Sequence, residues 1–159
     1  MIRTAGCRIH VTSFTYGTGN ADVTKIEYPD GGIETMAYDS AFHTVTSRVD
    51  QLGNHTTMTY DATTGDLLTI KDALNGVTTL VWGSGPPCGK PKGLLLSVTD
   101  PLGHTLTYTY NTTNLPRQLQ SMTDAAGNLT QYTYDSAGRR TGVQQPFTGG
   151  GEFVTSPTP

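Results

Sequence analysis

The side chains of this chain that could do chemistry are four histidines, two cysteines and a recurring set of aspartates. The histidines are scattered along the sequence: His10, His43, His55 and His104. His55 and His104 both follow an Asp-x-x-Gly segment, so a repeating fold could bring such positions together on one rim. The alternative is that they are solvated turn residues. A metal site needs several ligands close together, and the sequence predicts none.

The aspartates recur with a glycine close behind them. If repeats stack, their carboxylates could form a ladder that binds a hard cation such as calcium. The alternative is that each carboxylate caps the backbone of its own turn. Turn capping accounts for every member of the set, so we expect no metal and no cofactor. The segments are Asp30-Gly31, Asp50 with Gly53, Asp72 with Gly76, Asp100 with Gly103, and Asp124 with Gly127.

The two cysteines are Cys7 and Cys88. A disulfide between them is possible in an oxidising compartment, but sequence separation cannot establish that they approach each other. The alternative of two unpaired thiols stays open. Outside the repeat there is no Ser/His/Asp order, phosphate-binding glycine loop or spaced carboxylate pair. We therefore predict no catalytic residues and no enzyme.

Six aromatic residues mark a regular period along the chain, with separations of 22, 22, 22, 28 and 24 residues. These beat aromatics are Tyr16, Tyr38, Tyr60, Trp82, Tyr110 and Tyr134. Each is followed by a turn-forming residue, in order Gly17, Asp39, Asp61, Gly83, Asn111 and Asp135. A period of this length indicates a repeat architecture. Repeats usually build extended surfaces, and not a single catalytic pocket.

The segments before the beat aromatics show the alternation of β-strands. Leu106, Tyr108 and Tyr110 alternate with threonines, and both residue types suit a half-buried pleated surface. The sequence predicts an all-β fold of about six repeats, whose antiparallel β-hairpins stack into a continuous curved sheet or a solenoid-like arc. We expect this domain at residues 1–146, with an irregular loop at 83–93. Residues 147–159 are expected to form a flexible tail rich in Gly, Pro and Thr.

This pattern resembles the YD repeat, also called the Rhs repeat, over roughly residues 14–146. The resemblance rests on the Tyr-Asp pairs and their turn glycines together with the alternating Asp-x-x-Gly segments. The matching residues are Tyr38-Asp39, Tyr60-Asp61 with Gly65, Tyr134-Asp135 with Gly138, and the turns at 50, 100 and 124. The aspartate is missing after Tyr16, Trp82 and Tyr110.

The resemblance implies hairpin repeats that form the shell of polymorphic toxins and related surface proteins. It also implies a secreted or cell-surface location, although no signal peptide is visible in the sequence. In related proteins an Asp-Pro-x-Gly-like element belongs to a self-cleaving segment. Here Asp100-Pro-Leu-Gly103 falls on the repeat and a complete repeat follows it, so we interpret it as a turn.

Two hypotheses from different classes remain. The first is a non-catalytic structural segment of an encapsulating or surface-displayed shell. Its partners would be neighbouring repeats, a cargo polypeptide, or further copies joined edge to edge into fibres. The second is an extracellular adhesin module that binds glycans or a protein through its aromatic stripe. A net charge of −3 with scattered basic residues argues against nucleic-acid binding, and no apolar run approaches a membrane span.

Overall fold

The computed structural model describes residues 10–19, 21–83, 93–112 and 117–145. Cys7, Cys88, nearly all of the predicted loop at 83–93 and the predicted tail at 147–159 lie outside these ranges. The predictions made for them stay predictions. The chain forms two compact units, one up to residue 59 together with residues 71–75, the other comprising residues 60–70 and those from 76 onward. Each unit is described by itself.

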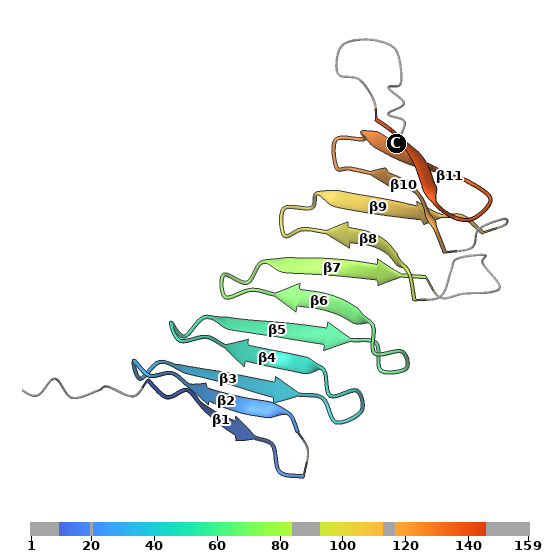
Figure 1. Cartoon of the computed structure of the whole chain (residues 1–159). Coiled ribbons are helices and arrows are strands. Elements are labelled where there is room, and N and C mark those ends of the chain that lie inside the picture. The colour runs from blue at the N-terminus through green and yellow to red at the C-terminus, as the bar shows by residue number, and fades with distance from the viewer. Residues whose placement is uncertain (1–9, 20, 84–92, 113–116, 146–159) are drawn as a thin grey trace, which may run out of the picture. The chain divides into compact units, whose positions relative to one another are not determined.

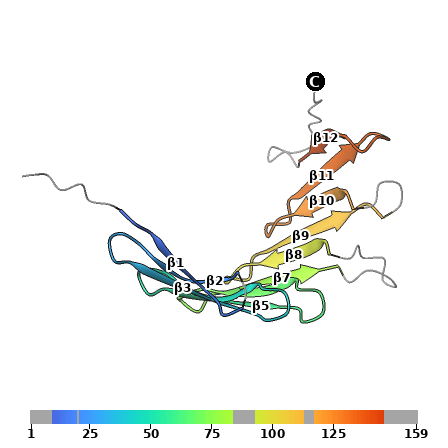
Figure 2. The ribbon, with the colours of Figure 1, turned by 60° about the horizontal axis from the view of Figure 1, so that its bottom comes forward.

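The first unit is an antiparallel sheet in which each strand pairs with the next one in sequence. Figure 1 shows these strands side by side, from dark blue to teal, and the turned view in Figure 2 agrees. The strands are β1 (Ser13–Tyr16), β2 (Val23–Glu27), β3 (Ile33–Tyr38), β4 (Val45–Val49) and β5 (His55–Tyr60), of which Tyr60 itself falls in the second unit.

The second unit repeats this arrangement, again in sequence order and antiparallel. Its strands are β6 (Leu67–Lys71), of which Lys71 itself falls in the first unit, β7 (Val77–Trp82), β8 (Leu95–Thr99), β9 (Thr105–Tyr110), β10 (Leu119–Thr123), β11 (Leu129–Tyr134) and β12 (Arg140–Gln144). The six beat aromatics end the six odd-numbered strands. The predicted all-β fold of about six stacked antiparallel hairpins is confirmed.

The sheets have no conventional apolar core. Among the described residues no apolar side chain is buried, and the buried polar ones are Glu34, Ser121 and Thr130, with 7–8% of their surface exposed. Most strand side chains are half-buried against their neighbours on the adjacent strand. In such an array each repeat is stabilised mainly by the repeats beside it, so contacts between adjacent hairpins determine whether the sheet holds.

A β-bulge lies beside Tyr16, Tyr38, Trp82, Tyr110 and Tyr134. The aromatic faces the first residue of the next strand, and the residue after that one is an extra residue that has no partner of its own in the register. The extra residues are Thr24, Thr46, Leu96, Gln120 and Thr141. A bulge bends its strand, increases the local twist and re-aims the nearby side chain. The aromatic therefore sits where the ladder is interrupted, which the period of the sequence did not predict.

Candidate functional site

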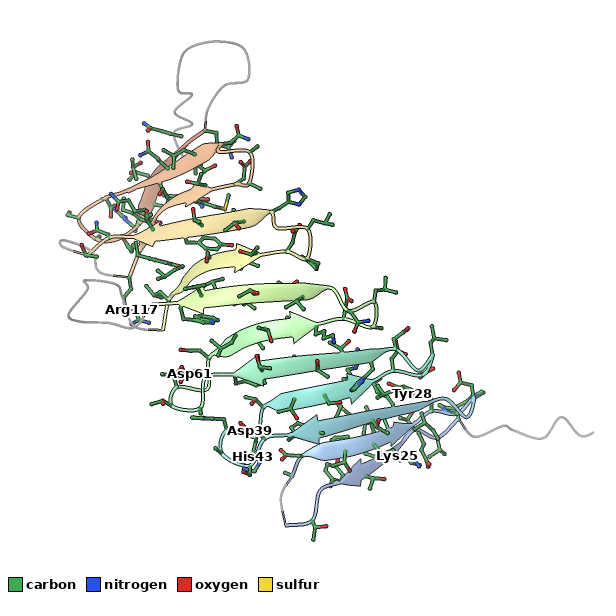
Figure 3. The ribbon with its side chains drawn as sticks, turned by 180° about the vertical axis from the view of Figure 1, so that it is seen from behind. Lys25, Tyr28, Asp39, His43, Asp61 and Arg117 are labelled. Atoms are coloured by element: carbon green, nitrogen blue, oxygen red, sulfur yellow. The ribbon has the colours of Figure 1, made fainter. Side chains whose placement is uncertain are left out.

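The features that recur in every repeat are two kinds of turn and the beat aromatics. In the first unit Tyr28 lies at one end of the strands and Asp39 and His43 at the other (Figure 3). Turns of the first kind, here called short turns, precede an odd-numbered strand. Turns of the second kind, here called aromatic-side turns, follow a beat aromatic.

Asp124 illustrates how a short turn is closed. Its Oδ1 accepts hydrogen bonds from the backbone N–H groups of Ala126 and Asn128 at 2.9 and 2.8 Å, and its Oδ2 accepts one from the Asn128 side chain at 2.8 Å. The Gly127 N–H donates to the Asp124 carbonyl at 3.0 Å. The pKa of Asp124 is lowered chiefly by the Asn128 side chain, then by backbone N–H groups.

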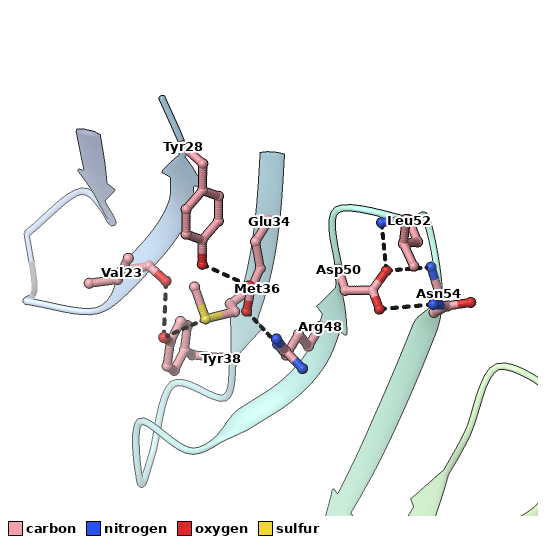
Figure 4. Close-up of polar contacts among 9 residues, drawn as sticks. All are labelled: Val23, Tyr28, Glu34, Met36, Tyr38, Arg48, Asp50, Leu52 and Asn54. Atoms are coloured by element: carbon pink, nitrogen blue, oxygen red, sulfur yellow. Dashed lines mark hydrogen bonds and ion pairs between the residues drawn. The ribbon is translucent and has the colours of Figure 1, made fainter. Parts of the chain in front are cut away.

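The short turns at Asp50 and Asp100 have the same geometry. Asn54 fills the place of Asn128 in the first (Figure 4), and His104 fills it in the second, with Nδ1 2.8 Å from Asp100 Oδ2. Hydrogen bonding to these side chains is the leading cause that lowers the pKa of Asp50 and of Asp100. Asp100-Pro-Leu-Gly103 therefore folds as an ordinary short turn, as interpreted from the sequence.

Two short turns depart from the predicted landmarks. At Asp72 the residue with positive φ is Asn75, at 67°, and not Gly76. Its N–H donates to the Asp72 carbonyl at 3.1 Å, as a turn glycine does elsewhere. In the turn at 28–32 Tyr28 takes the place of the aspartate, because its carbonyl accepts from the Gly31 N–H at 2.9 Å. Asp30 lies inside this turn and caps the Gly32 N–H at 3.0 Å.

Aspartates also cap the aromatic-side turns that carry the Tyr-Asp pair. Asp39 accepts the N–H groups of Ala41 and Phe42, at 3.0 and 2.7 Å, through a single carboxylate oxygen. Asp61 and Asp135 do the same in their turns, and Asp135 Oδ2 also accepts from Arg139 Nε at 2.7 Å. Backbone N–H donors are the leading cause that lowers the pKa of each of these three aspartates.

The beat aromatics are tied to the preceding hairpin by their polar ring atoms. In these aromatic ties the donor reaches the carbonyl of the residue fifteen positions earlier, which begins the preceding even-numbered strand. Four such ties join Tyr38 to Val23 at 2.9 Å (Figure 4), Trp82 to Leu67 at 2.7 Å, Tyr110 to Leu95 at 2.8 Å and Tyr134 to Leu119 at 2.8 Å. Burial raises the pKa of Tyr38 and Tyr110. The rings thus connect neighbouring repeats.

Tyr16 differs from these four aromatics. Its side chain lies on β1, the outer strand of the first unit, and the residue is 57% exposed. Its hydroxyl makes no hydrogen bond within the described residues, whereas Tyr38, Trp82, Tyr110 and Tyr134 are half-buried and tied.

A buried carboxylate in the first unit was not identified from the sequence. Glu34 on β3 is 8% exposed, and its two oxygens accept from Arg48 Nε on β4 and from the Tyr28 hydroxyl at 3.3 Å (Figure 4). The hydrogen bond with Arg48 is the leading cause that lowers the Glu34 pKa. Because both oxygens are engaged in holding adjacent strands together, the arrangement is structural.

The histidines occupy separate sites. His43 pairs with Asp22 at 2.8 Å, His55 with Ser47 at 2.8 Å, and His104 with Asp100. In the described part of the chain no three His, Cys, Asp or Glu residues are grouped so as to hold a metal ion. No helix in the same part is long and apolar enough to cross a membrane.

The second unit carries an open cavity of about 620 Å³ beside β11. It is lined by Asn111, Gln120, Tyr132, Thr133, Tyr134, Asp135 and Ser136. The Arg140 guanidinium lies 6.0 Å from the centre of the Tyr132 ring, at the limit of a cation–π contact. Amide, hydroxyl and carboxylate groups beside an aromatic ring are chemistry that can bind a polar ligand.

Comparison with known proteins identifies the repeat. The family model described as RHS Repeat matches residues 91–116 and 118–149. No curated protein matches the chain.

Solved structures that resemble this chain include the Tc holotoxin pore of Photorhabdus luminescens, carrying a mutation in TccC3. That chain is 18% identical, with a TM-score of 0.46, over 92% of this chain and 9% of its own length. A crystal structure of TcdB2-TccC3 is 17% identical, with a TM-score of 0.41, over 88% of this chain and 9% of that one. This chain spans about a tenth of the length of these structures.

The matched segments contain Tyr110, Tyr134, the short turns at Asp100 and Asp124, and two of the aromatic ties. The same ties and turns recur outside the match, at Tyr38 and at Asp50. The predicted resemblance is confirmed: residues 91–116 and 118–149 of this chain match the RHS repeat.

Proposed function

We propose that this chain is a non-catalytic structural segment of a secreted or cell-surface RHS-repeat shell. The observation that carries the proposal is the set of aromatic ties. Four beat aromatics direct their only polar ring atom at the backbone of the preceding hairpin, at 2.7–2.9 Å. A ring used in this way stabilises the sheet, and its polar tip is not free for a ligand.

The turn carboxylates support the same interpretation. Six aspartates have lowered pKa values, and in each case the cause is hydrogen bonding within its own turn. A catalytic acid or base usually has a pKa shifted toward the working pH, which is the opposite direction for a carboxyl group. The recurring aspartates therefore fit a structural role in a protein shell.

As part of a wall, the segment would contact neighbouring repeats on its outer strands and a cargo polypeptide on one face. A sheet of this kind has backbone N–H and C=O groups along its outermost strands that need partners. Those partners would be further repeats, supplied by a longer chain or by other copies joined edge to edge.

Trp82, the only tryptophan, tests the proposal directly. Replacing Trp82 by Phe removes the donor to the Leu67 carbonyl, and we expect the free energy of unfolding to fall by about 1 kcal/mol. Acrylamide should quench Trp82 fluorescence much less in the folded chain than in guanidinium. Chemical denaturation and quenching measure the two effects.

Tyr132→Phe is the matched control, because the Tyr132 hydroxyl makes no hydrogen bond within the described residues and Tyr132 lies on β11 of the same unit. We expect it to change stability by less than about 0.5 kcal/mol. Equal quenching of folded and unfolded chains, together with an unchanged stability of Trp82→Phe, would contradict the structural proposal.

The cavity beside Tyr132 favours a second candidate, an adhesin module that binds glycans. Tyr132 offers a ring face, and Gln120 and Ser136 offer hydrogen-bonding groups beside it. Titration calorimetry with a panel of neutral oligosaccharides tests this function. Binding that Tyr132→Ala removes would support the adhesin, and no binding across the panel would exclude those sugars as ligands.

A further inference from the structure

The aromatic ties and the bulges form a repeating series of contacts across each sheet, here called the relay. Tyr110 lies opposite Leu119 across a bulge, and the Leu119 carbonyl accepts the tie from Tyr134. Tyr134 in turn is the register partner of Arg140, the first residue of β12. The same order holds in the first unit, where Tyr16 lies opposite Val23 and the Val23 carbonyl accepts the tie from Tyr38.

Within the described residues, two positions of this relay lack a partner. At β1 the relay supplies a donor, because Tyr16 is 57% exposed and its hydroxyl makes no hydrogen bond within the described residues. At β12 it supplies an acceptor position, because Arg140 stands where Val23, Leu95 and Leu119 stand in their repeats. No side chain in the described part of the chain donates to the Arg140 carbonyl.

The backbone direction at the two outer strands follows from the ladder. The Asp135 N–H bonds the Arg139 carbonyl, so alternation makes the Tyr132–Val143 pair a non-hydrogen-bonded one. The N–H and C=O of Val143 therefore point away from β11. By the same argument from the Gly17–Asp22 bond, the backbone groups of Phe14 and Tyr16 point away from β2.

We propose that β12 of one copy of this chain pairs antiparallel with β1 of a second copy, and that Tyr16 of the second copy donates to the Arg140 carbonyl of the first. This inference rests on the structural role proposed above and names its partner. The contact joins two different edges, so it is heterologous and extends the sheet by adding copies head to tail.

The register of this pairing is set by the β4–β5 pair, in which Ser47 faces Thr57 and Arg48 faces Thr56. On β12, Gly142 corresponds to Ser47 and Val143 corresponds to Arg48, because each pair directly follows the extra residue of its bulge. At the start of β1, Ser13 corresponds to Thr57, and Thr12, the residue before it, corresponds to Thr56. These two residues precede their counterparts by 44 positions, the same separation as between Tyr16 and Tyr60. The docked strands should therefore place Gly142 opposite Ser13 and Val143 opposite Thr12.

The side chains of β1 agree with a missing neighbour. All four residues of β1 are exposed, and Phe14 is 52% exposed. Met36, its counterpart on β3, is half-buried beside Tyr38. Docking of a second copy would cover Phe14 and Tyr16 as the interior strands are covered, and removal of this apolar surface from water favours association.

Light scattering and negative-stain electron microscopy of the full chain over a range of concentrations test the assembly. We expect chains of copies that lengthen with concentration. Val143→Pro removes an outward N–H and should abolish assembly, whereas Val143→Ala keeps that N–H and should leave it largely intact. Tyr16→Phe should weaken association about fivefold, from the loss of one hydrogen bond.

Cysteine cross-linking tests the register. In a background where Cys7 and Cys88 are serine, Thr12→Cys chains mixed with Val143→Cys chains should form a mixed disulfide, because residues that face each other in a ladder lie within bonding distance. Disulfides within either variant alone, or assembly unaffected by Val143→Pro, would overturn the pairing.

The two proposals fail separately. A monomeric chain that Trp82→Phe destabilises would overturn the head-to-tail pairing and leave the structural role standing. A chain that assembles but is indifferent to Trp82→Phe would contradict the structural role of the ties.

Discussion

The two kinds of turn differ in how much their length varies. In four short turns the closing hydrogen bonds span five residues, at 28–32, 50–54, 100–104 and 124–128. Those of the aromatic-side turns span five residues at 135–139, six at 17–22, 39–44 and 61–66, eight at 111–118 and twelve at 83–94. One end of each hairpin is thus constant, and the other accepts insertions.

The difference has a physical cause. In three of the short turns a carboxylate bonds the N–H groups two and four residues ahead, so an added residue would break the cap. On the other side the aromatic tie holds the end of the strand before the turn begins. Since the strand end is already fixed, the following turn can lengthen, at a small cost in loop entropy.

Acid should have the largest effect, because both kinds of turn depend on ionised aspartates. Six aspartates have pKa values below the usual 3.8. A lowered pKa stabilises the fold above 3.8, and this stabilisation is lost as the pH falls through the folded-state values. Urea midpoints between pH 6 and pH 2.5 should drop steeply at the acid end.

Matched variants divide the acid effect between the two kinds of turn. Asp124→Asn removes one titrating group from a short turn, and Asp61→Asn removes one from an aromatic-side turn. Each should make the acid dependence shallower. If only one of them did so, ionised caps would stabilise one class of turn alone.

Gly127→Val should have the next largest effect. Gly127 has φ of +84° in a constant turn, and an added Cβ would meet no atom within 4 Å. The cost is therefore backbone strain, which we expect to lower the free energy of unfolding by about 2 kcal/mol.

Gly127→Asn is the control, because Asn75 adopts φ of 67° at the matching place in another short turn. It should cost clearly less than valine in the same denaturation experiment. Equal losses for asparagine and valine would mean that strain is not what selects glycine there.

His43 should give the smallest effect. It closes an aromatic-side turn with φ of 54°, and the hydrogen bond to Asp22 raises its pKa above the usual 6.5. A raised pKa stabilises the fold below 6.5, and the contribution is lost as the pH rises through the folded value. His43 is half exposed, so the change in urea midpoint between pH 6 and pH 8.5 should be slight.

His43→Asn keeps a residue that tolerates positive φ and should remove this slope. A slope that persists in the variant would place its origin in another group.

The sequence alone determined the class of the fold and the place of each repeat. Tyr, Thr and Leu in alternation require strands, and Asp with Gly or Asn at a regular period requires turns between them, because these preferences are local. The predicted beat aromatics accordingly end the odd-numbered strands, and the predicted aspartates cap turns. Where the local signal was ambiguous, the predicted turn residues were displaced. Asn75 and not Gly76 has the positive φ, and Tyr28 and not Asp30 begins its turn.

Only the tertiary structure decided what the aromatics do. A ring at a regular spacing fits exposure to a ligand as well as contact with a neighbour, and the choice depends on a carbonyl fifteen residues away that only the antiparallel register brings within reach. The bulges, the pairing of Glu34 with Arg48 and the exposure of Tyr16 depend on register in the same way. Side chains on adjacent strands meet only after the strands have paired, so their contacts cannot be predicted from the local sequence.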